Sequence, residues 1–220
     1  MLSVVIPALD AAATLPSCLA SLAGAADEIV LADGGSRDAT VRLAEAAGAR
    51  VIVSPKGRGL QLAAGAEAAN GDWLLFLHAD TVPDPGWREA VNAHIQRRPN
   101  HAACFRFRLD DPAWQARLIE HGVAARVRLL GLPYGDQGLL MPAALYRRLG
   151  GYRPWPLMED VDLVRRIGRR RLHLLAADAV TSAERWRRGG WFRRSARNLL
   201  MLGLYGLGVS PERLAARYRR

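Results

Sequence analysis

Short apolar runs alternate regularly with helix-forming segments along the first third of this chain. Four runs are predicted strands, at residues 3–7, 28–32, 50–53 and 73–77. Helices are predicted between them, around residues 15–22, around residues 38–47, and from the KGRG stretch at residues 56–59 to about residue 69. Successive strand–helix units of this kind predict an α/β layer with a mostly parallel sheet.

Two of the predicted strands end in a carboxylate. The run WLLFL at residues 73–77 is continuously apolar, as strands buried on both faces of a parallel sheet are, and HAD follows it directly. The second run ends in Asp33 and a glycine pair. Asp33 and Asp80 therefore lie where open parallel sheets bind ligands. A single acid after a strand also fits a solvated loop residue. Only the other motifs of the chain distinguish this interpretation from a ligand-binding carboxylate.

The first turn limits the kind of nucleotide site. Residues 7–12 (PALDAA) contain no glycine, which excludes the phosphate-binding loops of dinucleotide and P-loop sites. A nucleotide diphosphate held by strand-end carboxylates needs a divalent cation, Mn²⁺ or Mg²⁺, shared between the protein and the phosphates. Asp80 is the candidate metal ligand, and Arg58 is placed to help neutralise the phosphates.

Several motifs follow one another in a specific order: SVVIPALDAAATLPSCLASL, EIVLADGGSRDAT, GRGLQ, GDWLLFLHADT and MEDVDLVRRI. In this order they resemble the family 2 glycosyltransferases, inverting enzymes of the GT-A fold. The resemblance is to the small bacterial members with a GRxxQ…HADT pattern, and it covers about residues 2–175. It implies a nucleotide-binding α/β/α sandwich with a mostly parallel central sheet and a C-terminal helical appendage.

The resemblance also implies roles for individual residues. Asp33 would contact the nucleobase, Asp80 would bind the metal, and Asp160 would be the catalytic base. His78 stands where the family has the first acid of its DxD metal motif. The implied substrate-binding residues are Pro7, Ala8, Asp33, Gly34, Arg58, Gln61, His78, Asp136 and Glu159. Asp136 fits an acceptor or pyrophosphate site and a simple turn equally well, and the acids of MEDVDL also suit an ordinary helix N-terminus.

The implied reaction is an inverting, metal-assisted transfer of a sugar from a UDP- or GDP-sugar to an acceptor. One carboxylate takes the acceptor proton while the metal stabilises the leaving diphosphate. The sugar, the base and the acceptor are left open, a lipid-linked acceptor included. A nucleotidyltransferase and a non-catalytic basic membrane or nucleic-acid binder are the alternatives. Carboxylates at three strand or loop ends favour an enzyme, and nucleic acid is not expected as a partner.

The charge is unevenly placed along the chain. The net charge is +10, Lys56 is the only lysine, and arginines concentrate in the last third. We expect a glycosyltransferase domain over residues 1–180 and a basic amphipathic helical segment over residues 181–220. An anionic partner suits such a segment.

The role of the basic segment stays open at this stage. Its uncharged run, residues 198–210, is shorter than the roughly 20 apolar residues that cross a bilayer. A helix in the membrane interface, a homodimer contact and packing on the core all fit its pattern. The first residues form a strand and resemble no signal peptide, so a cytoplasmic location is expected, with association to the inner face of the membrane as an open alternative.

Overall fold

The computed structural model describes residues 1–218, so Arg219 and Arg220 of the basic segment lie outside the described residues. Within this range the chain forms one eight-stranded sheet. Its strands are β1 (Leu2–Ala8), β2 (Glu28–Asp33), β3 (Arg50–Val53), β4 (Trp73–Phe76), β5 (Thr81–Pro83), β6 (Ala102–Leu109), β7 (Leu139–Pro142) and β8 (Leu172–Thr181). Their order across the sheet is β3-β2-β1-β4-β7-β6-β8-β5.

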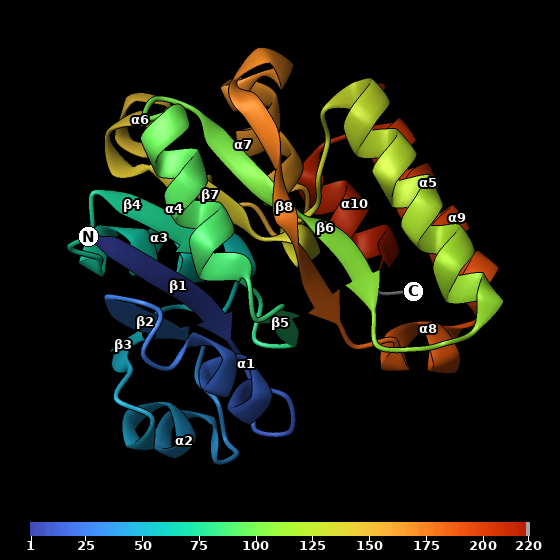
Figure 1. Cartoon of the computed structure of the whole chain (residues 1–220). Helices are drawn as coiled ribbons and strands as arrows, with labels where there is room; N and C mark the ends of the chain where they lie inside the picture. The colour runs from blue at the N-terminus through green and yellow to red at the C-terminus, as the bar shows by residue number, and fades with distance from the viewer. Residues whose placement is uncertain (219–220) are drawn as a thin grey trace.

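The helices surround this sheet (Figure 1). They are α1 (Leu15–Leu22), α2 (Thr40–Ala46), α3 (Arg58–Ala68), α4 (Trp87–Arg97), α5 (Trp114–Leu130), α6 (Ala143–Arg148), α7 (Glu159–Ile167), α8 (Glu184–Gly189), α9 (Trp191–Gly206) and α10 (Pro211–Tyr218). Two short 3₁₀ turns, η1 (Gly135–Gln137) and η2 (Arg169–Arg171), precede β7 and β8.

The first half of the chain follows the predicted pattern. Strands β1 to β4 are mutually parallel where they pair, and every residue of β4 is buried. β4 pairs with β1 on one side and antiparallel with β7 on the other. β6 and β8 are again parallel, so the sheet is mixed but mostly parallel. The predicted α/β/α fold with a mostly parallel sheet is confirmed.

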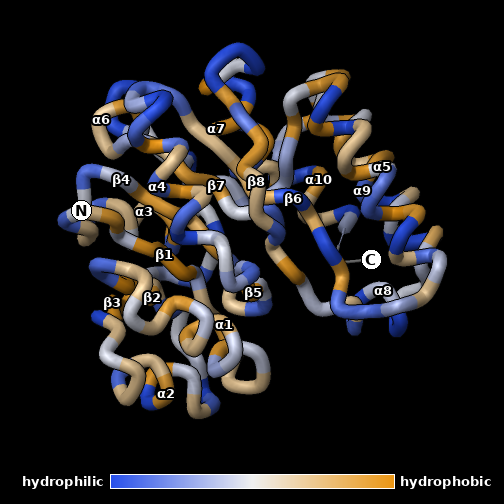
Figure 2. The backbone as a smooth tube through the Cα atoms, viewed as in Figure 1, coloured by the Kyte–Doolittle hydropathy of each residue, from blue (hydrophilic) through white to orange (hydrophobic). Residues whose placement is uncertain are grey.

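Alternating side chains of the strands build two cores, one on each face of the sheet. On one face Val4 and Ile6 of β1 pack with residues of α1, α2 and α4. On the other face Val5 and Phe76 pack with residues of α3, α6 and α7. Since successive residues of a strand point to opposite faces, one apolar strand serves both layers. Figure 2 shows hydrophobic residues along β1 in the interior.

The C-terminal helices pack around the second half of the sheet. Trp186 of α8 packs with Phe107 of β6, and Met201 of α9 packs with Val161 of α7. α9 lies beside α5 (Figure 1). Over residues 1–218, every helix is too short or too polar to cross a membrane.

Candidate functional site

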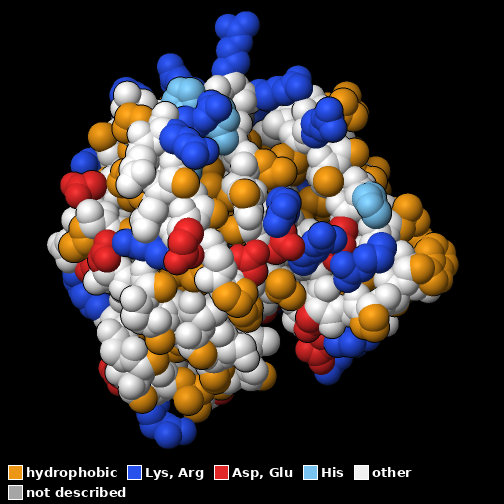
Figure 3. All heavy atoms as spheres, in the orientation of Figure 1, with side chains coloured by type: hydrophobic (Ala, Val, Ile, Leu, Met, Phe, Trp, Pro, Cys, Tyr) orange, Lys and Arg blue, Asp and Glu red, His pale blue; other side chains and the backbone are white. Residues whose placement is uncertain are grey.

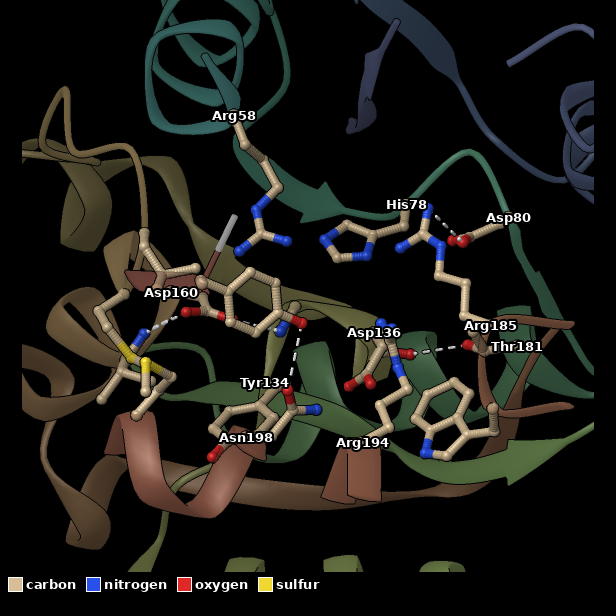
Figure 4. A pocket seen from close by; sticks show the side chains of 17 residues that line it. Arg58, His78, Asp80, Tyr134, Asp136, Asp160, Thr181, Arg185, Arg194 and Asn198 are labelled. Atoms are coloured by element: carbon tan, nitrogen blue, oxygen red, sulfur yellow. Dashed lines mark hydrogen bonds and ion pairs between the residues drawn. The ribbon is translucent and has the colours of Figure 1, made fainter. Parts of the chain in front are cut away.

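A cavity of about 370 Å³ opens beyond the carboxyl end of β4 (Figure 4). Side chains from distant parts of the chain line it, including α3, η1, α7, α8, α9 and α10. Five of the residues singled out in the sequence are among them: Arg58, His78, Asp80, Asp136 and Asp160. The cavity therefore brings three carboxylates and several arginines together.

Asp80 lies just after β4, where the buried strand reaches the cavity. Its side chain is 13% exposed and forms an ion pair with Arg185, in which Nη2 of Arg185 lies 3.2 Å from Oδ2 of Asp80. The Arg185 side chain is 64% exposed and comes from α8. A solvent-exposed guanidinium is thus the only cationic side chain that the structure pairs with Asp80 among the described residues.

Asp160 is held rigidly at the beginning of α7. Its Oδ2 accepts a hydrogen bond from the backbone N–H of Gly135 and its Oδ1 accepts one from Val161, each at 2.8 Å. Met158, directly before the helix, has a left-handed backbone with φ of 66°. Such a conformation is strained for a residue other than glycine, and it turns the chain so that the helix begins at the cavity wall. Asp160 is therefore a pre-oriented carboxylate at a helix N-terminus.

Arg58 and Glu159 form a pair beside the cavity. Nε of Arg58 donates to Oε1 of Glu159, whose side chain is fully buried. Burial raises the pKa of Glu159, and Arg58 opposes that increase. Because Glu159 holds Arg58 through Nε, the guanidinium is fixed at the cavity wall (Figure 4). Glu159 itself does not line the cavity.

Asp136 and His78 both have unusual protonation properties. Burial raises the pKa of Asp136 to about 6, and the negative charges of Asp160 and Asp80 add to the increase. Oδ1 of Asp136 is buried without a hydrogen-bond partner. Burial lowers the pKa of His78 to about 4, with Arg58 as the next cause, so His78 is a neutral imidazole at neutral pH. A Cβ on Gly135 would lie 2.6 Å from Nε2 of His78, so only glycine fits there.

The remaining predicted residues lie apart from the lining of this cavity, at the carboxyl ends of β1 and β2. Nε2 of Gln61 donates to the carbonyls of Ala8 and Ala32 at 2.6 and 3.0 Å. Asp33 accepts hydrogen bonds from the backbone N–H groups of residues 35 and 36. Pro7 and Gly34 belong to the same strand ends. Contact between this group and a substrate stays a prediction.

Sequence reasoning did not assign the cavity residues contributed by the basic segment. These are Arg185, Trp186, Arg194, Asn198, Met201 and Tyr218. Cζ of Arg194 lies 4.9 Å from the centre of the Trp186 ring, and its Nε is buried without a hydrogen-bond partner. Arg194, Asn198 and Met201 recur at helical spacing on a face opposite Leu199 and Leu200, and this spacing was the one signal in the sequence.

The chain matches a family model and curated relatives over its first part. The model for glycosyl transferase family 2 matches residues 3–148. A PGL/p-HBAD biosynthesis glycosyltransferase of Mycobacterium bovis is 41% identical over 90 residues, covering 36% of this chain and 35% of the relative. A glucosyl-3-phosphoglycerate synthase of Mycolicibacterium paratuberculosis is 36% identical over 98 residues, covering 38% and 30%. The chain thus matches about a third of the length of these relatives.

Solved structures extend the likeness over most of the chain. Glucosyl-3-phosphoglycerate synthase from Mycobacterium tuberculosis, in complex with Mn²⁺, UDP-glucose and phosphoglyceric acid, aligns with a TM-score of 0.59 and 24% identity, covering 79% of this chain and 68% of that one. S. aureus TarS with UDP-GlcNAc aligns with a TM-score of 0.63 and 16% identity, covering 82% and 58%. At these identities the likeness establishes the fold. With the family model matching well over half of its residues, the chain belongs to glycosyl transferase family 2.

Proposed function

We propose that this protein is an inverting glycosyltransferase that moves a sugar from a nucleoside-diphosphate sugar to an acceptor hydroxyl. The observation that carries the proposal is the shared cavity, in which the carboxylates of Asp160 and Asp80 face the same space together with Arg58 and Arg185. One carboxylate can take the proton of the acceptor hydroxyl, while the arginines of the cavity bind the negative charge of the leaving diphosphate. A single displacement needs both functions at once.

Asp160 is the proposed general base. Two backbone N–H groups fix its carboxylate in place. The acceptor hydroxyl gives its proton to Asp160 as its oxygen bonds to the anomeric carbon. The bond from that carbon to the diphosphate oxygen breaks on the opposite face, and the electron pair leaves with the diphosphate. Attack and departure on opposite faces invert the anomeric configuration.

The cavity offers positive charge to the leaving diphosphate. Arg58, Arg185 and Arg194 line the same space. Guanidinium groups bind phosphate oxygens bidentately and carry their charge at every physiological pH. Arg185 would exchange its ion pair with Asp80 for one with the diphosphate, and Arg194 has an unpartnered Nε inside the cavity wall.

The carboxylates of Asp80 and Asp136 suit a divalent cation that also takes ligands from the substrate, since the described residues contain no group of three or more His, Cys, Asp or Glu side chains placed to hold one. Burial raises the pKa of Asp136, the negative charges of Asp160 and Asp80 add to the increase, and its Oδ1 is buried without a partner. Crowded negative charge of this kind suits a hard cation with oxygen ligands. Asp80 would hold Mn²⁺ or Mg²⁺, with Asp136 beside it and phosphate oxygens completing the ligands. When bound, the cation would supply charge neutralisation for the leaving group.

The donor is proposed to be a UDP-sugar or GDP-sugar. The solved structures similar to this chain contain UDP-glucose and UDP-GlcNAc, which favours a UDP-sugar over a GDP-sugar as the donor. Asp33 would contact the base from the end of β2, and residues 1–180 would form the domain that binds the donor. The segment 181–220 would complete the diphosphate site through Arg185 and Arg194.

A thermal-shift screen of nucleotide sugars, each with and without Mn²⁺, tests the proposal. A ligand that binds only the native state raises its unfolding midpoint by mass action. We expect metal-dependent stabilisation by at least one nucleotide sugar, and its absence in Asp80→Asn. The matched control Asp72→Asn lies at the far end of β4, away from the cavity. The products of turnover give a second test. Release of pyrophosphate instead of a nucleoside diphosphate would contradict the proposal and favour a nucleotidyltransferase.

A further inference from the structure

Exposed apolar side chains are concentrated on two neighbouring helices. Of the eleven large apolar side chains that are exposed within residues 1–218, eight belong to α5, to α9 or to the residue after α9. The other three are scattered over the rest of the described surface. Single exposed apolar residues are ordinary, whereas a contiguous group of this kind marks an interaction surface.

On each of the two helices, exposed apolar residues recur at helical spacing. On α5 these are Trp114, Leu118, Ala125 and Leu129. On α9 and just after it they are Phe192, Ala196, Leu199, Gly203 and Leu207. Steps of three, four or seven residues keep such side chains on one side of a helix. α9 therefore presents an apolar stripe from its first turn to the residue after it, whereas on α5 the exposed His121 lies between Leu118 and Ala125 in the apolar stripe.

The stripes lie side by side and form one surface, which we call the α5–α9 face. The rings of Trp114 and Phe192 join the first turns, with centroids 6.0 Å apart. α5 and α9 run in the same direction (Figure 1). Figure 3 shows hydrophobic side chains along this margin of the molecule, with basic side chains beside them.

The exposed charged residues on the two helices of the α5–α9 face have one sign. Glu120 is the only acidic residue of the two helices, and it is buried. Arg128 and Arg193 are exposed, and Arg117 is half-buried at its border. A second copy of the chain docked here about a two-fold axis would bring arginines against arginines. A surface with negative charge and an apolar interior complements the face on both counts.

We propose that the α5–α9 face lies on an anionic lipid bilayer, with the apolar stripes in the headgroup region and the arginines against lipid phosphates. Helices with one apolar side and a basic border bind membranes in this way. The opposite side of α9 supplies Arg194, Asn198 and Met201 to the cavity. A single helix thus separates the bilayer from the site, which brings a lipid-borne acceptor hydroxyl close to Asp160. This last step rests on the proposed function.

Co-sedimentation of the full chain with vesicles tests the proposal. Phosphatidylglycerol-rich vesicles should bind the protein at low salt, pure phosphatidylcholine vesicles should bind it much less, and high salt should weaken the binding. Replacing both Leu199 and Leu200 by Gln should lower the vesicle affinity roughly tenfold or more, because each is more than half exposed and would leave the apolar phase. Trp114→Gln tests the α5 stripe independently.

Val53→Gln is the matched control, since Val53 is 86% exposed on β3, away from both helices. All variants should keep the wild-type unfolding midpoint and the same stabilisation by nucleotide sugar. Wild-type vesicle binding by the leucine variant would overturn the proposal. So would a concentration-dependent dimer in sedimentation velocity that the leucine variant abolishes, because a second copy would then cover the face. If the wild-type protein binds vesicles but transfers no sugar, that result would count against the proposed function and leave the membrane proposal standing.

Discussion

Two halves of the molecule beside the cavity hold their polar side chains in different ways. The first half, from β1 to α3, ties its polar side chains to the backbone, as Gln61 does with two carbonyls and Asp33 with two N–H groups. The second half, from α7 to α10, also holds Asp160 through backbone N–H groups, but it adds charged side chains that are paired with one another or left partly unpaired, as in Arg185 with Asp80 and in Arg194. Backbone-tied groups fix a shape, whereas exchangeable ion pairs can change partners when a ligand arrives. The difference assigns rigid positioning to the first half and charge neutralisation to the second.

The largest expected effect comes from Asp160, at the beginning of the second half. General-base assistance typically contributes ~10²–10⁴ in rate, so Asp160→Asn should lower sugar transfer by that order. Affinity for the donor should change little, because the amide keeps the shape of the carboxylate and the change affects proton transfer. Steady-state transfer and calorimetric donor binding measure the two separately. Near wild-type transfer would remove Asp160 as the base and leave Glu159 or Asp136.

The next effect tests whether the second half neutralises charge. Removing one preorganised donor to a developing negative charge typically costs on the order of 10² in rate. Arg185→Gln should therefore lower kcat by about that factor if Arg185 binds the diphosphate. Arg187→Gln is the matched control, since Arg187 lies on the same helix and pairs with Asp111 outside the cavity. Equal rates in the two variants would show that the ion pair with Asp80 is only structural.

The strands and the placement of Asp80 and Asp160 at the cavity were predictable because their determinants are local. A fully apolar β4, the turn after it and the acids in the first turn of α7 can each be recognised within a few residues of sequence. The C-terminal wall depends on a contact between Arg185 and Asp80, which are about a hundred positions apart. In the sequence an arginine that lines a cavity looks like one that faces solvent, and only packing separates Arg194 from Arg193.

A smaller effect is expected where the two halves meet, at Asp136. Its pKa of about 6 lies above the ordinary 3.8, so the folded state favours the protonated carboxyl. Stability conferred by that proton is present at low pH and is lost as the pH rises through about 6. At pH 8 Asp136→Asn should therefore raise the free energy of unfolding by on the order of 1–3 kcal/mol, with a smaller gain at pH 5. Urea unfolding at both pH values measures this.

Exposed Glu45 offers the control for that measurement. Glu45→Gln changes the net charge by the same amount on α2 and should shift stability equally at pH 5 and pH 8. The same pH-dependent gain in both variants would show a general charge effect. A loss of stability in Asp136→Asn at pH 8 would mean that the ionised carboxylate is stabilised by its surroundings, contrary to the burial that raises its pKa.

The smallest effect compares one helical glycine from each half. A Cβ on Gly65 of α3 would lie 2.4 Å from Cγ1 of Val5, whereas a Cβ on Gly203 of α9 would meet no atom within 4 Å. Overpacking typically costs about 1–3 kcal/mol, so Gly65→Ala should destabilise the fold. Gly203→Ala should stabilise it by roughly 0.5–1 kcal/mol, since alanine loses less backbone entropy in a helix. Chemical unfolding of both variants without lipid measures the difference. A destabilising Gly203→Ala would mean that this side of α9 is packed in solution, and the contrast between a close-packed first half and an open outer face would fail.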